Sequence, residues 1–281
     1  MKDKKTLIFS DSHIASSNID ELKDVFEEIM TYDANRVICL GDFYDKKLLT
    51  SDELIFGTSI IKQFVDKYSD VTMLEGNHDK NTIKYIKDLG VKVYDSVVID
   101  NNFYGHFFVE ASIKSFNSAK RSLRELDQYN YAFLGHQHSF QILKEKRIHP
   151  GSIHWVDFGE VDDTSKNIII LENNEIDIIE LTTPVPMIDV FKIKTLDKLN
   201  KRYKVRYVFK NFKQLKNEAN ELESYKDKFY QFKTKLDFDT KGETLEIAPK
   251  KNTNEIINQW LLNIEDLDVK RELELSFKNN G

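Results

Sequence analysis

The sequence has a single cysteine, no apolar run long enough to span a membrane, no internal repeat and no low-complexity tract. One cysteine excludes a disulfide within the chain and a metal site built from several thiolates. Cys39 lies in the apolar run Val37-Ile38-Cys39-Leu40, so we expect it to pack as a small hydrophobic side chain. The first residues lead into a short strand without the apolar core of a signal peptide. These absences favour a cytoplasmic protein without contact to a membrane.

The length of 281 residues, of which 40% are hydrophobic, is sufficient for a core domain and a smaller second unit. The segment 182–235 contains 14 basic and 6 acidic residues, a balance of +8, whereas residues 1–181 have a balance of −10. This asymmetry indicates that the later segment contacts a polyanion and that acidic residues of the first part bind metal. A solvated charged face is the alternative explanation.

In the first part of the chain, short apolar runs alternate with segments whose apolar residues have helical spacing. Strands are predicted at 6–10, 36–40 and 71–74, with amphipathic helices at 18–31 and 52–68. This order predicts a largely parallel sheet covered by helices. Further strands at 97–99, 103–109, 131–134 and 168–171, with a helix at 115–126, predict a second sheet. The expected fold class is an α/β sandwich of two mixed sheets flanked by helices.

The composition changes near residue 182. Pro184 and Pro186 predict a stiff linker, because each proline fixes its own φ and restricts the preceding residue. Beyond them we predict strands at 188–193 and 203–209, a charged helix at 215–230, and a helix at 254–267 with an apolar stripe. The chain is therefore expected to divide into a domain at 1–181 and a smaller α+β domain at 182–281.

Polar residues follow several of the predicted strands, where α/β proteins place their sites. In chain order these motifs are Asp11-Ser12-His13, Gly41-Asp42-Phe43-Tyr44-Asp45, Gly76-Asn77-His78-Asp79, the single His106, and Gly135-His136-Gln137-His138. Each motif alone is more often a surface turn or a buried core histidine. Their succession at strand ends favours a site instead, whereas His149 and His154 lack such support and are interpreted as structural.

Mixed oxygen and imidazole ligands predict a site for two divalent ions such as Mn, Fe, Zn or Co rather than Ca. Two such ions can activate water and neutralise phosphoryl oxygens during hydrolysis of a phosphate ester. Residues two apart on extended backbone point the same way, so Asp11 with His13, and His136 with His138, can reach adjacent ions. The candidate ligands are Asp11, His13, Asp42, Asn77, His106, His136 and His138.

These five motifs resemble those of the calcineurin-like metallophosphoesterase superfamily. The resemblance implies that Asp42 bridges two ions, one held also by Asp11, His13 and His138, the other by Asn77, His106 and His136. It also implies that His78 acts on the scissile phosphate, protonating the leaving oxygen or stabilising the transition state. Asp45 would orient and charge the imidazole of His78; a helix cap or turn residue is the alternative explanation of Asp45.

A narrower resemblance covers residues 129–160, where Pro150-Gly151-Ser152 and Phe158-Gly159-Glu160 follow the last motif. This pattern is similar to the SbcD branch, the nuclease subunit of the SbcCD double-strand-break repair complex, in a compact version typical of bacteriophages. It implies a Mn²⁺-dependent DNA exonuclease and endonuclease, commonly homodimeric, that works with an SbcC-type coiled-coil ATPase in DNA end processing, repair or recombination. The basic segment would belong to a capping domain, with Lys201, Arg202, Lys204, Arg206 and Lys210 contacting DNA phosphates.

Three alternatives stay open at this point. The listed basic residues could be solvent-facing strand residues without a DNA contact. The same scaffold could serve a phosphatase or a cyclic-nucleotide phosphodiesterase, or a non-catalytic interaction module. Relatives of the SbcD branch usually continue into a segment that docks on the ATPase, whereas this sequence has few residues beyond the expected capping domain. The motifs therefore support the hydrolytic chemistry more strongly than they support binding of the ATPase.

Overall fold

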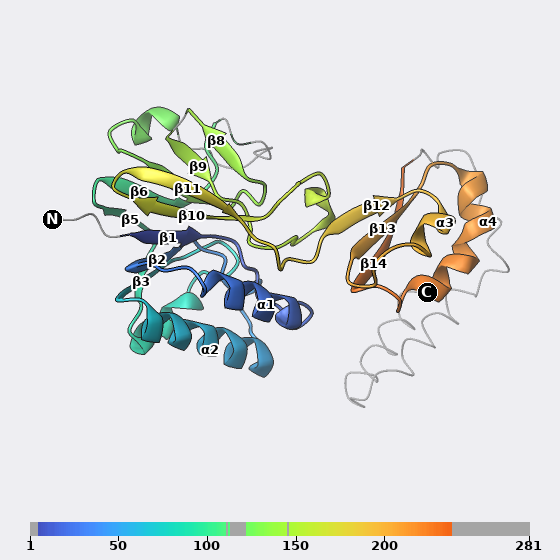
Figure 1. Cartoon of the computed structure of the whole chain (residues 1–281), viewed down its shortest axis with the longest axis horizontal. Helices are drawn as coiled ribbons and strands as arrows, with labels where there is room; N and C mark the ends of the chain where they lie inside the picture. Colours follow the sequence, from blue (N-terminus) through green and yellow to red (C-terminus); the bar gives the residue numbers. More distant parts are fainter. Residues whose placement is uncertain (1–4, 111, 113–121, 145, 238–281) are drawn as a thin grey trace, which may run out of the picture. The chain divides into compact units, whose positions relative to one another are not determined.

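The computed structural model describes residues 5–110, 112, 122–144 and 146–237 (Figure 1). Within these residues the strands form three sheets. The helix predicted at 254–267 lies outside the described residues, as does most of the helix predicted at 115–126. Of the latter, the structure describes the short 3-10 helix η2 (Leu123–Leu126). No helix in the described part of the chain is long and apolar enough to cross a membrane.

The first sheet has the strand order β11-β10-β1-β2-β3-β4. Its strands are β1 (Thr6–Phe9), β2 (Arg36–Cys39), β3 (Asp70–Leu74), β4 (Lys92–Tyr94), β10 (Asn167–Glu172) and β11 (Glu175–Glu180). Strands β1 to β4 run parallel, which confirms the parallel sheet predicted from the alternating pattern.

Strand β10 was expected in the second sheet, and this prediction is wrong. It pairs antiparallel with β1, with Leu7 opposite Ile170. Both faces of β10 are buried, since Ile168 and Ile170 pack in the core beside the helices while Ile169 packs against the other sheet. A strand buried on both faces is a continuous apolar run, and such a run carries no information about which sheet it joins.

Among the described residues, one face of the first sheet is covered by α1 (Ile19–Ile29), α2 (Ser51–Lys67) and the 3-10 helix η1 (Ile83–Leu89). Helix α1 buries Leu22, Val25, Phe26 and Ile29, which is the spacing of one helical stripe. Helix α2 begins at a capping box in which Thr50 and Glu53 bond each other's backbone N–H groups. In Figure 1, α1 and α2 lie on the same side of β1, β2 and β3.

The second sheet has the strand order β5-β6-β7-β9-β8 and packs on the opposite face of the first. Its strands are β5 (Ser96–Ile99), β6 (Asn102–His106), β7 (Ala132–Gly135), β8 (Gln141–Leu143) and β9 (Arg147–His149), followed by the 3-10 helix η3 (Phe158–Glu160). Ile8, Ile38 and Leu74 of the first sheet contact Tyr104 and Phe133 of the second. The α/β sandwich is therefore confirmed.

Residues 187–236 form a separate parallel sheet in the order β12-β13-β14. Its elements are β12 (Met187–Val190), α3 (Ile193–Leu196), β13 (Lys204–Phe209), α4 (Phe212–Leu222), the 3-10 helix η4 (Glu223–Tyr225) and β14 (Gln231–Leu236). The strand predicted at 188–193 ends at Val190. The helix predicted at 215–230 begins earlier, at Phe212, and ends earlier, at Leu222, where η4 follows. Strand β14 was missed because most of its side chains are exposed, which leaves little apolar alternation. The division at residue 182 stays a prediction.

Candidate metal centre

All the candidate ligands lie at the carboxyl ends of parallel strands. Asp11 and His13 follow β1, Asp42 follows β2, and Asn77 follows β3. His106 ends β6, while His136 and His138 follow β7, which runs parallel to β6. Because the two sheets are packed face to face, these ends meet at one edge of the sandwich.

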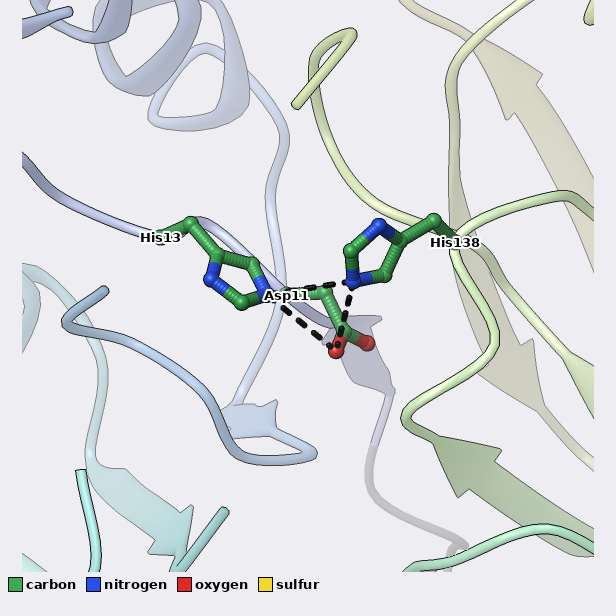
Figure 2. A group of neighbouring side chains, drawn as sticks. All are labelled: Asp11, His13 and His138. Carbon is green, nitrogen blue, oxygen red and sulfur yellow. Dashed lines mark hydrogen bonds and ion pairs between the residues drawn. The ribbon is translucent and has the colours of Figure 1, made fainter. Parts of the chain in front are cut away.

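The first metal group consists of Asp11, His13 and His138, whose ligand atoms all lie within 4.8 Å of one another. Figure 2 shows the two imidazole rings directed toward the same carboxylate, with His138 reaching it from the loop after β7. The two Nε2 atoms are 3.1 Å apart, and each lies 3.9 Å from Asp11 Oδ1.

The second metal group consists of Asp42, His106 and His136, again with ligand atoms within 4.8 Å of one another. His106 Nε2 lies 3.1 Å from Asp42 Oδ2 and 3.1 Å from Asn77 Oδ1, which adds the amide oxygen to this group. Asp42 Oδ2 also lies 3.8 Å from His13 Nε2. Asp42 therefore lies next to both groups, where a bridging carboxylate is required.

The outer nitrogen of three of these imidazoles is already engaged. Nδ1 lies 3.0 Å from Asp45 Oδ1 in His13, 2.9 Å from Glu160 Oε1 in His138, and 2.8 Å from the Leu40 carbonyl oxygen in His106. Each partner is an acceptor, so Nδ1 carries a proton, and Nε2, which points inward, is the nitrogen that would offer a lone pair to a metal ion once it is deprotonated. Lone pairs of His13 and His138 facing each other at 3.1 Å fit a cation between them. The residues present thus fit a site for divalent ions.

The protonation of the second metal group depends on Asp42. Burial lowers the pKa of His106, but the hydrogen bond and charge of Asp42 raise it by more, to about 9. Burial and the neighbouring His106 lower the pKa of His136 to about 4. Burial opposes ionisation of Asp42, yet His106 and His13 keep the pKa of Asp42 well below its usual range. A ligand imidazole must be deprotonated, so metal affinity should fall as the pH is lowered.

Four of these side chains stand on left-handed backbone. The φ angles are +53° at Asp11, +42° at His13, +49° at Asp42 and +79° at His136. Non-glycine residues rarely adopt this region, and such strain concentrates at functional sites. Gly76 has a related role, since a Cβ there would lie 1.9 Å from Asp42 Oδ1. The tight approach of the β3 loop to Asp42 therefore requires glycine.

A sequence model of the "Calcineurin-like phosphoesterase superfamily domain" matches residues 5–173, which is more than half of the chain. The chain belongs to the calcineurin-like phosphoesterase superfamily. Membership supports metal-dependent phosphoester hydrolysis as the general activity. The superfamily uses divalent metal ions, and the chain has candidate groups of residues to hold them. The match spans all five motifs, including both metal groups.

Several solved structures are similar to this superfamily member. A single mutant of Vps29 from Entamoeba histolytica is 16% identical, with a TM-score of 0.39, over 63% of this chain and 99% of that chain. Pseudomonas putida nuclease MPE is 15% identical, with a TM-score of 0.34, over 62% of this chain and 87% of that chain. Vps29 from Chaetomium thermophilum is 13% identical, with a TM-score of 0.35, over 66% of this chain and 100% of that chain. The search of curated proteins gave no match.

His78 lies beside the phosphoesterase metal groups on the exposed rim of the β3 loop. Its ring centroid is 4.7 Å from that of His13, and its Nδ1 donates to the main-chain oxygen of Asp45 at 2.8 Å. The Asp45 carboxylate instead accepts from His13 Nδ1. Asp45 thus orients His78 through its main chain and a candidate ligand through its side chain, which differs from the predicted arrangement.

Asp79 is a further residue that the site depends on, and sequence reasoning did not select it. Its buried carboxylate accepts from the backbone N–H groups of Phe43 at 2.8 Å and Gly76 at 2.9 Å, so it fastens the β2 loop to the β3 loop. Burial and the nearby Asp42 raise the pKa of Asp79 to about 6. Its position directly after His78 in the motif was the available signal.

Glu160 and Lys166 were also missed as site residues. Glu160 is fully buried, and while its Oε1 orients His138, its Oε2 accepts from Lys166 Nζ at 2.6 Å. Lys166 also pairs with Asp163 at 2.7 Å. Burial opposes ionisation of Glu160, yet His138 and Lys166 keep the pKa of Glu160 far below its usual range. The Phe-Gly-Glu segment thus contributes a carboxylate that stabilises one metal group.

Replacing this carboxylate should weaken metal binding. In Glu160→Gln the negative charge behind His138 is lost, and we expect Mn²⁺ affinity to fall about 10- to 100-fold. Unfolding in urea should also show a loss of about 3 kcal/mol, since the charge of Lys166 loses a buried partner. The control is Asp163→Asn, which removes the other partner of Lys166 without touching His138. It should lose stability but keep its Mn²⁺ affinity in calorimetric titration; equal affinities in both variants would contradict the role of Glu160.

The structure places the five predicted DNA contacts differently. Lys204 is 4% exposed and pairs with Glu21 at 2.7 Å, so it does not reach the surface and the prediction for it is wrong. Arg206 forms two bonds of 2.8 Å with Asp189. Lys201 and Arg202 are exposed, although Arg202 pairs with Asp24 at 3.2 Å, and Lys210 pairs with Asp237. DNA contacts of these four residues stay predictions.

The two remaining histidines lie outside both metal groups. His149 is fully buried, its Nδ1 donates to the Leu134 carbonyl at 2.8 Å, and its Nε2 lies 3.0 Å from Ser112 Oγ. His154 is likewise buried and contacts the Ser12 carbonyl. Both therefore have the satisfied contacts of structural histidines.

Proposed function

We propose that this superfamily member is a Mn²⁺-dependent DNA nuclease of the SbcD type, with exonuclease and endonuclease activity. The observation that carries the proposal is the pair of metal groups with Asp42 next to both of them, and with His78 on the rim beside them. When bound, two divalent ions would activate a water molecule and neutralise charge on the phosphate. Asp11, His13, Asp42 and His138 would hold one ion, and Asp42, Asn77, His106 and His136 the other.

The contribution of His78 follows from its hydrogen bond. A carbonyl oxygen can only accept, so Nδ1 of His78 carries a proton that it donates to the Asp45 main chain. This bond fixes the orientation of the ring, and Nε2 is the nitrogen available to deliver a proton to the leaving oxygen. His78 is exposed, which leaves room for a large substrate beside the ring. We therefore assign His78 the part of general acid.

Two observations support the SbcD type in particular. The Pro-Gly-Ser turn and the Phe-Gly-Glu segment, on which that resemblance rests, both converge on His138: Ser152 N donates to the His138 carbonyl at 2.9 Å, and Glu160 accepts from its ring. The balance of +8 in residues 182–235 is suited to a polyanion. We extend the proposal to a homodimer that works with an SbcC-type coiled-coil ATPase in DNA end processing.

The deciding experiment compares substrates. Mn²⁺-loaded chain should cleave linear DNA with a kcat/KM at least about 100-fold above that for bis(p-nitrophenyl) phosphate or a cyclic nucleotide, because remote contacts to DNA lower the barrier. His106→Ala, purified in parallel, should be inactive and excludes a contaminating nuclease. The opposite order of substrates would favour the small-molecule phosphodiesterase, and absence of hydrolysis with all three would favour an interaction module.

Binding of DNA should weaken steeply with salt, because contacts to phosphates release counterions. Replacing the exposed Lys201 by alanine should reduce the slope of log K against log salt by about 1 if it contacts a phosphate. The matched control is Lys62→Ala, an exposed lysine on α2 outside the basic segment, which should leave the slope unchanged. Fluorescence anisotropy at several salt concentrations measures both. A DNA affinity that does not change with salt concentration would contradict a contact between the basic segment and DNA phosphates.

A further inference from the structure

A chain of buried polar contacts connects β13 with the backbone between Asp11 and His13. His154 is 1% exposed, and its Nε2 lies 3.0 Å from the carbonyl oxygen of Ser12. On the other side of the ring, Nδ1 lies 3.4 Å from Lys204 Nζ. The ring of His154 thus lies between the loop after β1 and Lys204, which belongs to β13 of the three-stranded sheet.

Lys204 is fixed in place by acceptors. Its Nζ lies 2.7 Å from Glu21 Oε2 and 2.6 Å from the Trp155 carbonyl oxygen, while Val185 N donates to Glu21 Oε1 at 3.0 Å. Glu21 lies on α1 and is 3% exposed. The ammonium group therefore has two firm acceptors and a third partner in His154.

These partners select one tautomer of His154. The Ser12 carbonyl can only accept, so Nε2 must carry a proton. Nδ1 lies between a donor, the Lys204 ammonium at 3.4 Å, and an acceptor, the Glu21 carboxylate at 3.5 Å. Because Nε2 already carries the proton, a neutral ring offers the lone pair of Nδ1 to Lys204. Burial lowers the pKa of His154, in agreement with a neutral ring. With Lys204 in place, the ring therefore donates to Ser12 from Nε2.

The segment that receives this bond is strained. Asp11 and His13, on either side of Ser12, both have positive φ, so other contacts must hold the backbone there. Ser12 Oγ donates to the Phe43 carbonyl at 3.0 Å, and Asn18 Nδ2 donates to the His13 carbonyl at 2.9 Å. His154 supplies the bond to the carbonyl oxygen of Ser12, the residue between the two candidate ligands. Loss of that bond would let Asp11 and His13 turn away from a common ion.

We propose that His154 and Lys204 are positioning residues for the first metal group: Lys204 sets the tautomer of His154, and His154 fixes the Ser12 carbonyl so that Asp11 and His13 face one ion. The inference rests on the proposed metal assignment. It gives β13 of the three-stranded sheet a role in positioning the metal ligands, although all of those ligands follow strands of the other two sheets. His154 and Lys204 act through the backbone and touch neither metal nor substrate.

The test is calorimetric titration of the full chain with Mn²⁺ alone, supported by electron paramagnetic resonance of the bound ions. His154→Gln keeps an N–H at about the distance of Nε2, whereas His154→Asn is too short to reach Ser12 but still offers Lys204 a polar partner. Lys204→Met keeps the apolar stem and removes the charge. The matched control is Lys198→Met, an exposed lysine outside this network.

We expect His154→Asn and Lys204→Met to lose about 10- to 100-fold in affinity at one of two Mn²⁺ sites, the size seen when outer partners of metal ligands are removed. At limiting Mn²⁺ the spectrum should change from a coupled pair to an isolated ion. His154→Gln and Lys198→Met should resemble the parent. Unchanged binding in His154→Asn, or equal weakening at both sites in Asn and Gln variants alike, would overturn the inference. A parent chain that binds no Mn²⁺ would instead contradict the proposed function, and the inference with it.

Discussion

His78→Ala should bind Mn²⁺ like the parent and cleave DNA about 10²- to 10⁴-fold more slowly, the range for loss of a positioned general acid. The side chain belongs to neither metal group as assigned, and its ring is exposed, so its removal leaves no cavity in the core. What is lost is the proton that Nε2 can deliver to the sugar oxygen. Single-turnover cleavage of a labelled duplex at saturating Mn²⁺ measures the effect.

The leaving group supplies the control for this variant. A p-nitrophenolate departs without protonation, so hydrolysis of bis(p-nitrophenyl) phosphate by His78→Ala should decrease much less than cleavage of DNA. If the rates of hydrolysis of both substrates decrease equally, His78 acts in another way, for instance by stabilising charge on the phosphate. If DNA cleavage is unchanged, His78 has no part in the mechanism.

Asp42→Asn should reduce bound Mn²⁺ from two ions per chain to one or fewer, and hydrolysis by on the order of 10³ or more, because metal ions contribute several kcal/mol to charge stabilisation. Asparagine preserves the shape of the side chain and an oxygen for the bond from His78 N at 2.8 Å. It removes the charge that lies 3.1 Å from His106 Nε2 and 3.8 Å from His13 Nε2. Metal analysis after dialysis measures the number of bound ions, and a cleavage assay measures the loss of hydrolysis.

Asp45→Asn is the matched control for Asp42→Asn. Its carboxylate also contacts His13, but from the outer side of the ring at Nδ1, and its side chain is 42% exposed. We expect at most about a 10- to 100-fold loss of affinity at one site, with two ions still bound at high Mn²⁺. Equal effects of the two substitutions would argue against Asp42 as the bridge.

The sequence was informative where chemistry coincides with strand ends. The apolar runs before Asp11, Asp42 and Asn77 located the sheet, and a glycine or a second polar residue marked each loop. Outer partners could not be found in this way. Glu160 is 22 residues from His138, and the bond between them exists only because η3 folds back on the loop after β7.

The basic segment shows a second limit of sequence reasoning. A count of lysines cannot separate a surface cation from one paired inside the protein, and Lys204 and Lys201 lie in the same run of basic residues. Only the partners differ: Lys204 meets Glu21 from α1, a contact across 183 positions of sequence. Because both faces of β10 are buried, its sequence likewise did not indicate which of the two sheets it joins.

The single thiol of the chain offers a practical use. Cys39 ends β2 inside the core at 1% exposure, and burial raises the pKa of Cys39 well above its ordinary value. Thiolate is the reactive species, so a maleimide dye should label this side chain only when the sandwich opens. The rate of labelling then reports opening of the fold without any substitution. A second cysteine placed on the exposed face of β14 would take a fluorophore selectively, and could map the path of DNA along the basic segment.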